Sequence, residues 1–215
     1  DNRIPLIEDA AQSLGSKYKK SMSGNLGDIS ACSFSPTKPL PAFGNAGMVL
    51  TDDMDEAQLI QGMRYHSYNG VNLDHGYNSC IPESVSAQLN FLLGKYKSLL
   101  KKRKHVYEKY VELLSDSPVV FLDTDNNCVS NNSKLVVKVS NRDELMSYLN
   151  NMGIQTSFAY AKTLPSMKMF RQTETYNFPN ADSFCAEAIA LPIYPFLKDE
   201  EIKIVCEAIR KFYNV

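Results

Sequence analysis

One lysine, Lys38, stands in a segment whose residue types could do chemistry. The segment DISACSFSPTKPLPAFGNAGMVLTDD, residues 28–53, holds two apolar runs, 29–34 and 48–50, separated by prolines and glycines. This pattern predicts a strand, a loop that carries Lys38, and a second strand. A lysine among hydroxyls and prolines is usually a solvated loop residue, so a chemical role depends on what precedes it.

Two carboxylates precede Lys38 at the end of another apolar run. Residues 4–7 lead directly into Glu8 and Asp9, and residues 13–28 are rich in Gly, Ser and Lys, as in a crossover loop. Ligands of α/β folds bind at the carboxyl ends of strands, where we expect Asp9 and Lys38. The pair fits pyridoxal phosphate chemistry, in which the lysine forms a Schiff base and the carboxylate keeps the pyridine nitrogen protonated. By itself, Asp9 is more typical of a helix N-cap.

Longer motifs connect this pair to a known family. EDAAQSLGSKYKK, GNLGDISACSFSPTK and GNAGMVLTDD are followed by GYNSCIPESVSAQL (76–89) and LPIYPFLKDEEI (191–202). The chain resembles, in this order of motifs, the pyridoxal-phosphate sugar aminotransferases named for DegT and DnrJ. It departs from their usual pattern in KPLPAFGNAG, which in relatives borders the sugar site, and at Cys80, where an arginine is usual.

The resemblance implies a role for several residues. Relatives that act as dehydratases have a histidine at the position of Lys38, so the lysine favours amino transfer, with Lys38 as the catalytic proton carrier. Ser35 and Thr37 offer the same hydroxyl chemistry as Ser33. The implied cofactor contacts are Asp9 to the pyridine nitrogen, Gln12 near the ring hydroxyl, Ser33 to the phosphate and Lys38 by its Schiff base. The resemblance also implies that Asn78 contacts the phosphate of the cofactor bound in the partner subunit of a dimer.

Two further residues are candidates for substrate binding. Tyr160 stands where relatives have an aromatic or histidine that faces the active site, and its alternative is a core tyrosine of the small domain. His66 flanks a Gly/Asn-rich loop, and a structural or surface role is the commoner one for such a histidine. For Gln12, the alternative is a surface helix residue. No metal-ligand cluster is apparent, so no metal is expected.

Composition narrows the class of protein. The 215 residues have 44% hydrophobic content, 22% charged content and a formal net charge of -1, which favours neither nucleic acid nor an anionic membrane as a partner. No apolar stretch is long enough to span a bilayer and no secretory signal opens the chain. Five cysteines without paired spacing indicate reduced thiols and a cytoplasmic protein. The basic run 101–105 lies within a helical pattern and is read as a solvated face.

Periodicity predicts a long connecting helix at 83–116 and a small α/β domain at 117–215. The resemblance implies that residues 1–82 are the C-terminal part of a cofactor-binding large domain. Residues 4–8 are expected to form a buried strand and 29–35 the next, with an antiparallel strand at 48–51. Within the small domain, Asn141 is a plausible helix cap and Gly153 a helix stop. The predicted helices are 52–68, 141–153, 181–190 and 198–213, and the further strands are 119–123, 133–139 and 154–160. In the first of these helices, Asp52 or Asp53 is the expected cap and Leu59 is expected to face inward.

These expectations combine into an α/β protein of fold type I, the aspartate-aminotransferase-like architecture, with the N-terminal part of the large domain absent. The resemblance implies a homodimer with shared active sites, or a second chain that supplies the missing half. The implied reaction is transfer of an amine from glutamate to a keto group on a dTDP- or UDP-linked deoxysugar, in aminosugar or lipopolysaccharide biosynthesis.

Two alternatives stay open. The first is a non-catalytic fragment of such an enzyme, which lacks half of the cofactor site. The second is a fold type I amino-acid aminotransferase, which would need an arginine in the small domain to bind the substrate carboxylate. Among Arg142, Arg171 and Arg210, only Arg171 has a suitable place in the sequence, because Arg142 opens a helix and Arg210 is expected on an exposed helix face.

Overall fold

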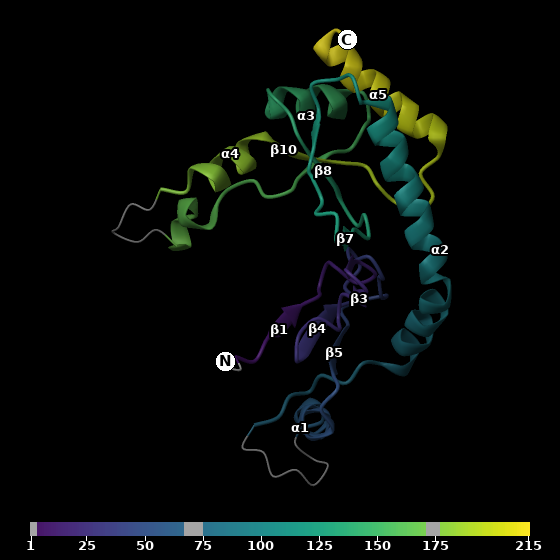
Figure 1. Cartoon of the computed structure of the whole chain (residues 1–215), viewed down its shortest axis with the longest axis vertical. Helices are drawn as coiled ribbons and strands as arrows, with labels where there is room; N and C mark the ends of the chain where they lie inside the picture. The colour runs from purple at the N-terminus through teal and green to yellow at the C-terminus, as the bar shows by residue number, and fades with distance from the viewer. Residues whose placement is uncertain (1–3, 67–74, 171–176) are drawn as a thin grey trace. The chain divides into compact units, whose positions relative to one another are not determined.

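The computed structural model describes residues 4–66, 75–170 and 177–215 (Figure 1). The chain forms two compact units. The first comprises residues 1–100 and 124–133, and the second comprises residues 101–123 and 134–215. A helix of 31 residues, α2 (Glu83–Leu113), contributes its first part to one unit and its last part to the other. It confirms the long helix predicted from the apolar spacing.

The main sheet of the first unit has three strands in the order β1 (Ile7–Asp9), β4 (Ile29–Ser33) and β5 (Gly47–Thr51). Strands β1 and β4 run parallel, and β4 and β5 run antiparallel. The predicted strand, loop and strand around Lys38 are therefore confirmed. Alternation within β4 places Ser30 and Cys32 inside the unit, as expected for a strand with one face on a core.

The prediction of a buried strand at residues 4–8 is wrong. Strand β1 begins at Ile7, and the side chains of Ile4 and Ile7 are 80% and 75% exposed. The physical reason is its place at the edge of the sheet: within the described residues, β1 pairs with β4 alone. An apolar run predicts a strand but does not tell whether other chain segments cover it.

Residues 13–28, predicted as a crossover loop, also contain a small hairpin. Strands β2 (Lys17–Tyr18) and β3 (Ser21–Met22) pair antiparallel, and β7 (Cys128–Val129) adds a third strand from far along the chain. Two-residue strands have no periodicity that a sequence pattern can reveal. The Asn-rich segment between the predicted strands 119–123 and 133–139 therefore does more than turn, because it joins the first unit.

Helix α1 (Met54–Arg64) begins where the sequence predicts. Asp53 is its N-cap, and its carboxylate accepts hydrogen bonds from the amides of Asp55 at 2.8 Å and Glu56 at 3.0 Å. The helix ends at Arg64, earlier than predicted, and Leu59, expected to face inward, is 40% exposed. The core of the unit lies instead between β4, α2 and the loop 34–46, here called the Lys38 loop. Its buried residues are Ala10, Cys32, Phe34, Leu40, Ala42, Leu89 and Tyr96.

The second unit is a four-stranded antiparallel sheet with helices. The strand order is β6 (Val120–Phe121), β8 (Leu135–Lys138), β10 (Ala188–Leu191) and β9 (Ser157–Phe158). The buried side chains of this unit come from the sheet, from α2 and from the helices α3 (Arg142–Asn151) and α5 (Asp199–Tyr213). Two short 3-10 turns, Leu164–Ser166 and Lys168–Phe170, precede helix α4 (Pro179–Glu187).

Strand β10 is the main element that sequence patterns missed. The predicted helix 181–190 ends at Glu187, and residues 188–191 form a central strand in which Ile189 is fully buried. A short apolar run such as AIAL fits a helix end or a buried strand equally well, and here the neighbouring strands decide. The predicted strand 154–160 is likewise reduced to the two residues of β9.

The ends of helix α3 show one confirmed stop and one N-cap residue at its predicted position but without a capping side-chain bond. Helix α3 ends at Asn151, and Gly153 then adopts the left-handed conformation (φ +77°) that lets the chain turn away. Asn141 occupies the N-cap position but is itself left-handed, and its side chain makes no capping hydrogen bond. Helix α5 agrees with the predicted helix 198–213.

Candidate active site

The parallel strands β1 and β4 bring two predicted cofactor contacts to one edge of the sheet. Asp9 is the last residue of β1 and pairs in register with Ala31, while Ser33 is the last residue of β4. Both strands run in the same direction, so their carboxyl ends meet, as the sequence predicts. Lys38 follows Ser33 on the loop between β4 and β5.

Asp9 does not cap a helix, because residues 11–15 form turns. One carboxylate oxygen, Oδ1, accepts the amide N–H of Ala11 at 3.0 Å, and the side chain is exposed. The N–H of Ala10 donates to the carbonyl of Ala31 at 2.9 Å and extends the strand pairing by one residue. The turn orients the Asp9 carboxylate at the edge of the sheet and leaves its second oxygen accessible.

Glu8, the neighbour of Asp9, holds the turn that precedes β4. Its Oε1 accepts hydrogen bonds from the Ser23 hydroxyl at 2.7 Å and the Gly24 amide at 2.9 Å, and Oε2 accepts the Leu26 amide at 2.9 Å. Burial raises the pKa of Glu8, but the bonds from Gly24, Ser23 and Leu26 outweigh it and hold this pKa below the ordinary range of glutamate.

A close approach of backbones completes this turn. A Cβ atom on Gly27 would lie 2.6 Å from the carbonyl oxygen of Leu6 and 3.1 Å from the amide nitrogen of Glu8. Only glycine fits there, and the N–H of Leu6 in turn donates to Asp28 Oδ2 at 2.7 Å. Polar contacts and a glycine therefore fix β1 against β4, in spite of the exposed apolar side chains of β1.

The Lys38 loop is tied back to the end of β4. The amide of Lys38 donates to Ser35 O at 2.9 Å, Ala42 N–H donates to Phe34 O at 2.7 Å, and Phe34 N–H donates to Ala46 O at 2.8 Å. Lys38 is half-buried, and in the described part of the chain its amine forms no ion pair.

Of the other predicted cofactor contacts, Ser33 lies beside this loop and Gln12 lies in the turn after Asp9. The Ser33 hydroxyl is half-buried and accepts the Ser35 amide at 3.4 Å, which leaves its proton available to an acceptor. The side chain of Gln12 is exposed. Its backbone carbonyl oxygen accepts a hydrogen bond from Asn131 Nδ2 at 2.9 Å, and this bond holds the backbone of the turn. The place of Gln12 in a turn excludes the alternative of a helix residue.

Asn78 and His66 lie together beyond helix α1. Asn78 forms an isolated antiparallel bridge with Tyr65, and the His66 amide donates to Tyr77 O at 3.2 Å. Both side chains are exposed, and His66 has a left-handed backbone (φ 56°). Of the sequence between them, residues 67–74 are outside the described residues.

Tyr160 belongs to the second unit, where it follows β9 and is 63% exposed. The alternative of a core tyrosine is therefore wrong. Nearby, the guanidinium of Arg142 lies 4.6 Å from the centre of the Phe158 ring and donates to Cys185 O at 2.6 Å. Arg142 is buried and engaged in these contacts, so it is not available to bind a substrate carboxylate.

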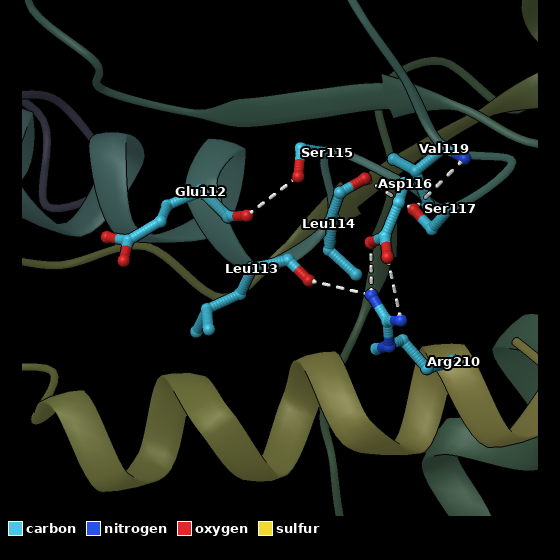
Figure 2. A network of polar contacts seen from close by, with 8 residues as sticks. All are labelled: Glu112, Leu113, Leu114, Ser115, Asp116, Ser117, Val119 and Arg210. Carbon is cyan, nitrogen blue, oxygen red and sulfur yellow. Dashed lines mark hydrogen bonds and ion pairs between the residues drawn. The ribbon is translucent and has the colours of Figure 1, made fainter.

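Arg210 is likewise engaged, contrary to its expected place on an exposed face. Figure 2 shows its guanidinium reaching from α5 to the carbonyl of Leu113, at 3.3 Å, and to both carboxylate oxygens of Asp116. The hydrogen bond from Arg210 holds the pKa of Asp116 below its ordinary value. Arg171, the third arginine considered, is outside the described residues. Of the three arginines, the two that the structure describes are therefore both engaged within the chain and not available to bind a substrate carboxylate.

The basic run 101–105 makes specific contacts and is not simply a solvated face. Lys102 lies 4.7 Å from the centre of the Phe196 ring, Arg103 donates to Ile193 O at 3.3 Å, and His105 Nε2 lies 2.8 Å from Asp199 Oδ1. These side chains fasten α2 to residues 193–199 of the same unit. A nucleic-acid role for the run gains no support from them.

Two neighbours of the candidate site were given no role by the sequence. Glu8 stands in the EDAAQ motif next to Asp9, so its position was a signal that the sequence carried. Gln88 of α2 contacts the Lys38 loop at Pro41 and Phe43, and no local pattern reveals this pairing. Within the described ranges, no helix is long and apolar enough to cross a membrane and no cluster of metal-binding side chains is found.

Curated relatives are aligned over nearly the whole chain. A pleiotropic regulatory protein of Geobacillus stearothermophilus is 31% identical over 98% of this chain and 59% of its own length. A UDP-2-acetamido-2-deoxy-3-oxo-D-glucuronate aminotransferase of Pseudomonas aeruginosa is 29% identical over 96% of this chain and 58% of its own length. The chain thus spans less than two thirds of these relatives.

Solved structures share the same fold. An aminotransferase from Brucella abortus has 27% identity and a TM-score of 0.90, and S. venezuelae DesV has 27% identity and a TM-score of 0.91. The chain covers 58% of each, which confirms the fold type I architecture and the expectation that the chain corresponds to part of it. The sequence model of the DegT/DnrJ/EryC1/StrS aminotransferase family matches residues 1–210 of this chain. The chain belongs to the DegT/DnrJ/EryC1/StrS aminotransferase family.

Proposed function

We propose that this chain is the lysine-bearing part of a pyridoxal-phosphate-dependent aminotransferase that acts on a nucleotide-linked keto sugar. One observation carries the proposal: Lys38 stands on the loop that follows Ser33, and Ser33 ends the strand parallel to the one that ends at Asp9. A carboxylate, a hydroxyl and a lysine are thereby gathered at one sheet edge. Family membership supports the same reaction class.

The residues of this edge fit pyridoxal phosphate. Asp9 presents a carboxylate that can accept a pyridinium N–H, and the Ser33 hydroxyl can donate to a phosphate oxygen. Bound pyridoxal phosphate supplies an electron sink that stabilises negative charge on the carbon beside the amine. Lys38 Nζ would bind the cofactor covalently, and as a free amine would take a proton from that carbon and deliver it to C4′ of the cofactor.

The remaining assignments follow the same proposal. Gln12 lies near the ring hydroxyl, Asn78 contacts the phosphate across a homodimer, and His66 and Tyr160 contact the substrate. These four side chains are exposed, which supports the proposal that they contact the cofactor or the substrate. The amino donor is glutamate and the acceptor a dTDP- or UDP-linked keto sugar, for which the relative named UDP-2-acetamido-2-deoxy-3-oxo-D-glucuronate aminotransferase gives support. The product would enter lipopolysaccharide or other aminosugar synthesis in the cytoplasm.

An absorbance titration with pyridoxal phosphate tests this function. The chain should gain a band at about 410–430 nm, typical of a lysine conjugate of the cofactor, and glutamate should bleach it. Lys38→Ala should abolish the band, and Lys20→Ala, at an exposed turn lysine, should not. An unchanged band in Lys38→Ala would contradict the assignment. No band in the wild-type chain would favour the alternative of a fragment that cannot hold the cofactor by itself.

A further inference from the structure

A side chain of helix α2 holds the Lys38 loop at two points. The amide nitrogen Nε2 of Gln88 donates to Pro41 O at 3.0 Å, and its Oε1 accepts the Phe43 N–H at 2.8 Å. Gln88 is half-buried, and the two bonds join residues 45 and 47 positions apart in the sequence. Both partners are backbone groups, so this pairing does not depend on the side chains of the loop.

The two bonds need the donor and the acceptor of one amide group. Pro41 offers a carbonyl oxygen and has no N–H, whereas the Phe43 N–H needs an acceptor. A glutamate could accept from Phe43 but could not donate to Pro41, and a leucine of similar size could do neither. The requirement at this position is therefore chemical and not only steric.

Gln88 completes the attachment of the loop to the unit. On the strand side, the backbone of Phe34 accepts from Ala42 and donates to Ala46. In between, Leu40 and Ala42 are 3% and 2% exposed and pack in the same core as Leu89, the residue next to Gln88. Lys38 precedes these anchors directly, so the helix side of its loop depends on the Gln88 amide.

We propose that Gln88 is a positioning residue for Lys38: by binding Pro41 and Phe43 it fixes the loop that presents the lysine amine. The inference rests on the proposed role of Lys38 and deepens it. Gln88 itself touches neither cofactor nor substrate in this account. Its removal should loosen the loop and weaken covalent cofactor binding, while strand β4 and helix α2 keep their structure.

Two measurements on the purified chain test this inference. The first is amide hydrogen exchange at Phe43, compared with residues of β4 and α2. The second is the dissociation constant for pyridoxal phosphate, read from the absorbance band. In Gln88→Leu, Phe43 exchange should rise about tenfold and cofactor binding should weaken about tenfold, because one protected N–H and both loop attachments are lost.

Matched variants separate positioning from general destabilisation. Gln88→Glu keeps the acceptor for Phe43 and should fall between wild type and Gln88→Leu in both measurements, and it serves if Gln88→Leu does not fold. Asn90→Leu changes an exposed amide on the same helix and should leave both values unchanged. If Gln88 only filled space, Gln88→Glu would bind the cofactor no better than Gln88→Leu.

The outcomes are distinct. Cofactor affinity within about twofold of wild type in folded Gln88→Leu would overturn the inference while the proposed function stands. Unchanged exchange at Phe43 would overturn it as well, whether or not the cofactor binds. If the wild-type chain binds no pyridoxal phosphate, the proposed function fails, and the assignment of Gln88 to cofactor positioning fails with it; raised exchange in Gln88→Leu would then show only that α2 holds the loop.

Discussion

The sheets of the two units are held together by different kinds of contact. In the second unit, the central strands β8 and β10 contribute buried apolar side chains to the core, with Val137 and Ile189 at 0% exposure. In the first unit, the edge strand β1 is largely exposed and is fixed by Glu8, Asp28 and a close glycine contact. Directed polar bonds therefore hold the strand that carries Asp9, whereas burial of apolar side chains holds the central strands of the second unit.

The largest expected effect comes from a matched pair of isoleucines, one in each sheet. Ile189→Ala should lower the free energy of unfolding by about 2–5 kcal/mol, because it leaves a cavity in a fully buried site. Ile7→Ala should change it by less than about 0.5 kcal/mol, because Ile7 is 75% exposed. Urea denaturation followed by circular dichroism measures both. Equal losses would mean that β1 is covered and that the comparison is wrong.

A second prediction concerns the polar attachment of β1. Glu8→Gln should lower the free energy of unfolding by about 1–2 kcal/mol near neutral pH, because a neutral amide replaces a carboxylate that accepts three hydrogen bonds. Glu56→Gln is the control, since the exposed Glu56 carboxylate accepts one hydrogen bond within the described part of the chain, from the Thr51 hydroxyl at 2.9 Å. A loss in Glu56→Gln as large as in Glu8→Gln would argue against a special role for Glu8.

The pH dependence of this effect has a definite sign. The pKa of Glu8 is lower in the folded chain than its ordinary value, so its contribution is fully present above the unfolded-state pKa of about 4.3. That contribution is lost as the pH falls through the folded-state pKa. The difference in unfolding free energy between wild type and Glu8→Gln should therefore shrink below about pH 4. A difference that grows on acidification would contradict the assignment.

The smallest expected effect is at the Arg210–Asp116 pair of Figure 2. Both groups reach solvent, and ion pairs at the surface contribute little to stability. Asp116→Asn should lower the melting temperature slightly, less than Glu8→Gln does, and the change should diminish in high salt. A large, salt-independent loss would mean that polar bonds are as important in the second unit as in the first.

The sequence predicted most of the elements that depend on local patterns. The strand, loop and strand around Lys38, the Asp53 cap of α1, the length of α2 and helix α5 all follow from apolar spacing and capping chemistry. The expectation that Asp9 and the Lys38 loop stand at the carboxyl ends of strands agrees with the parallel pairing of β1 and β4, whereas Ser33 was chosen from the family resemblance. Apolar periodicity predicted that Asp9 and Lys38 lie at strand ends, and the family motifs then assigned them their cofactor roles.

The remaining features depend on contacts between distant residues. Ala188–Leu191 is a strand because β8 and β9 flank it, and Cys128–Val129 is a strand because β2 is there to pair with it. The exposure of Ile7, the binding of Arg210 to Asp116 and the reach of Gln88 to Pro41 are likewise tertiary. No local pattern in the sequence determines which partner such a residue meets.

The central claim is that Lys38 is the residue that carries the cofactor. Borohydride reduction of the chain with pyridoxal phosphate, followed by peptide mass mapping, tests this most directly, because reduction makes the lysine–cofactor bond permanent. The account predicts one dominant label, on the peptide that contains Lys38, and its loss in Lys38→Ala. A label spread evenly over the exposed lysines, or one that persists in Lys38→Ala, would contradict it.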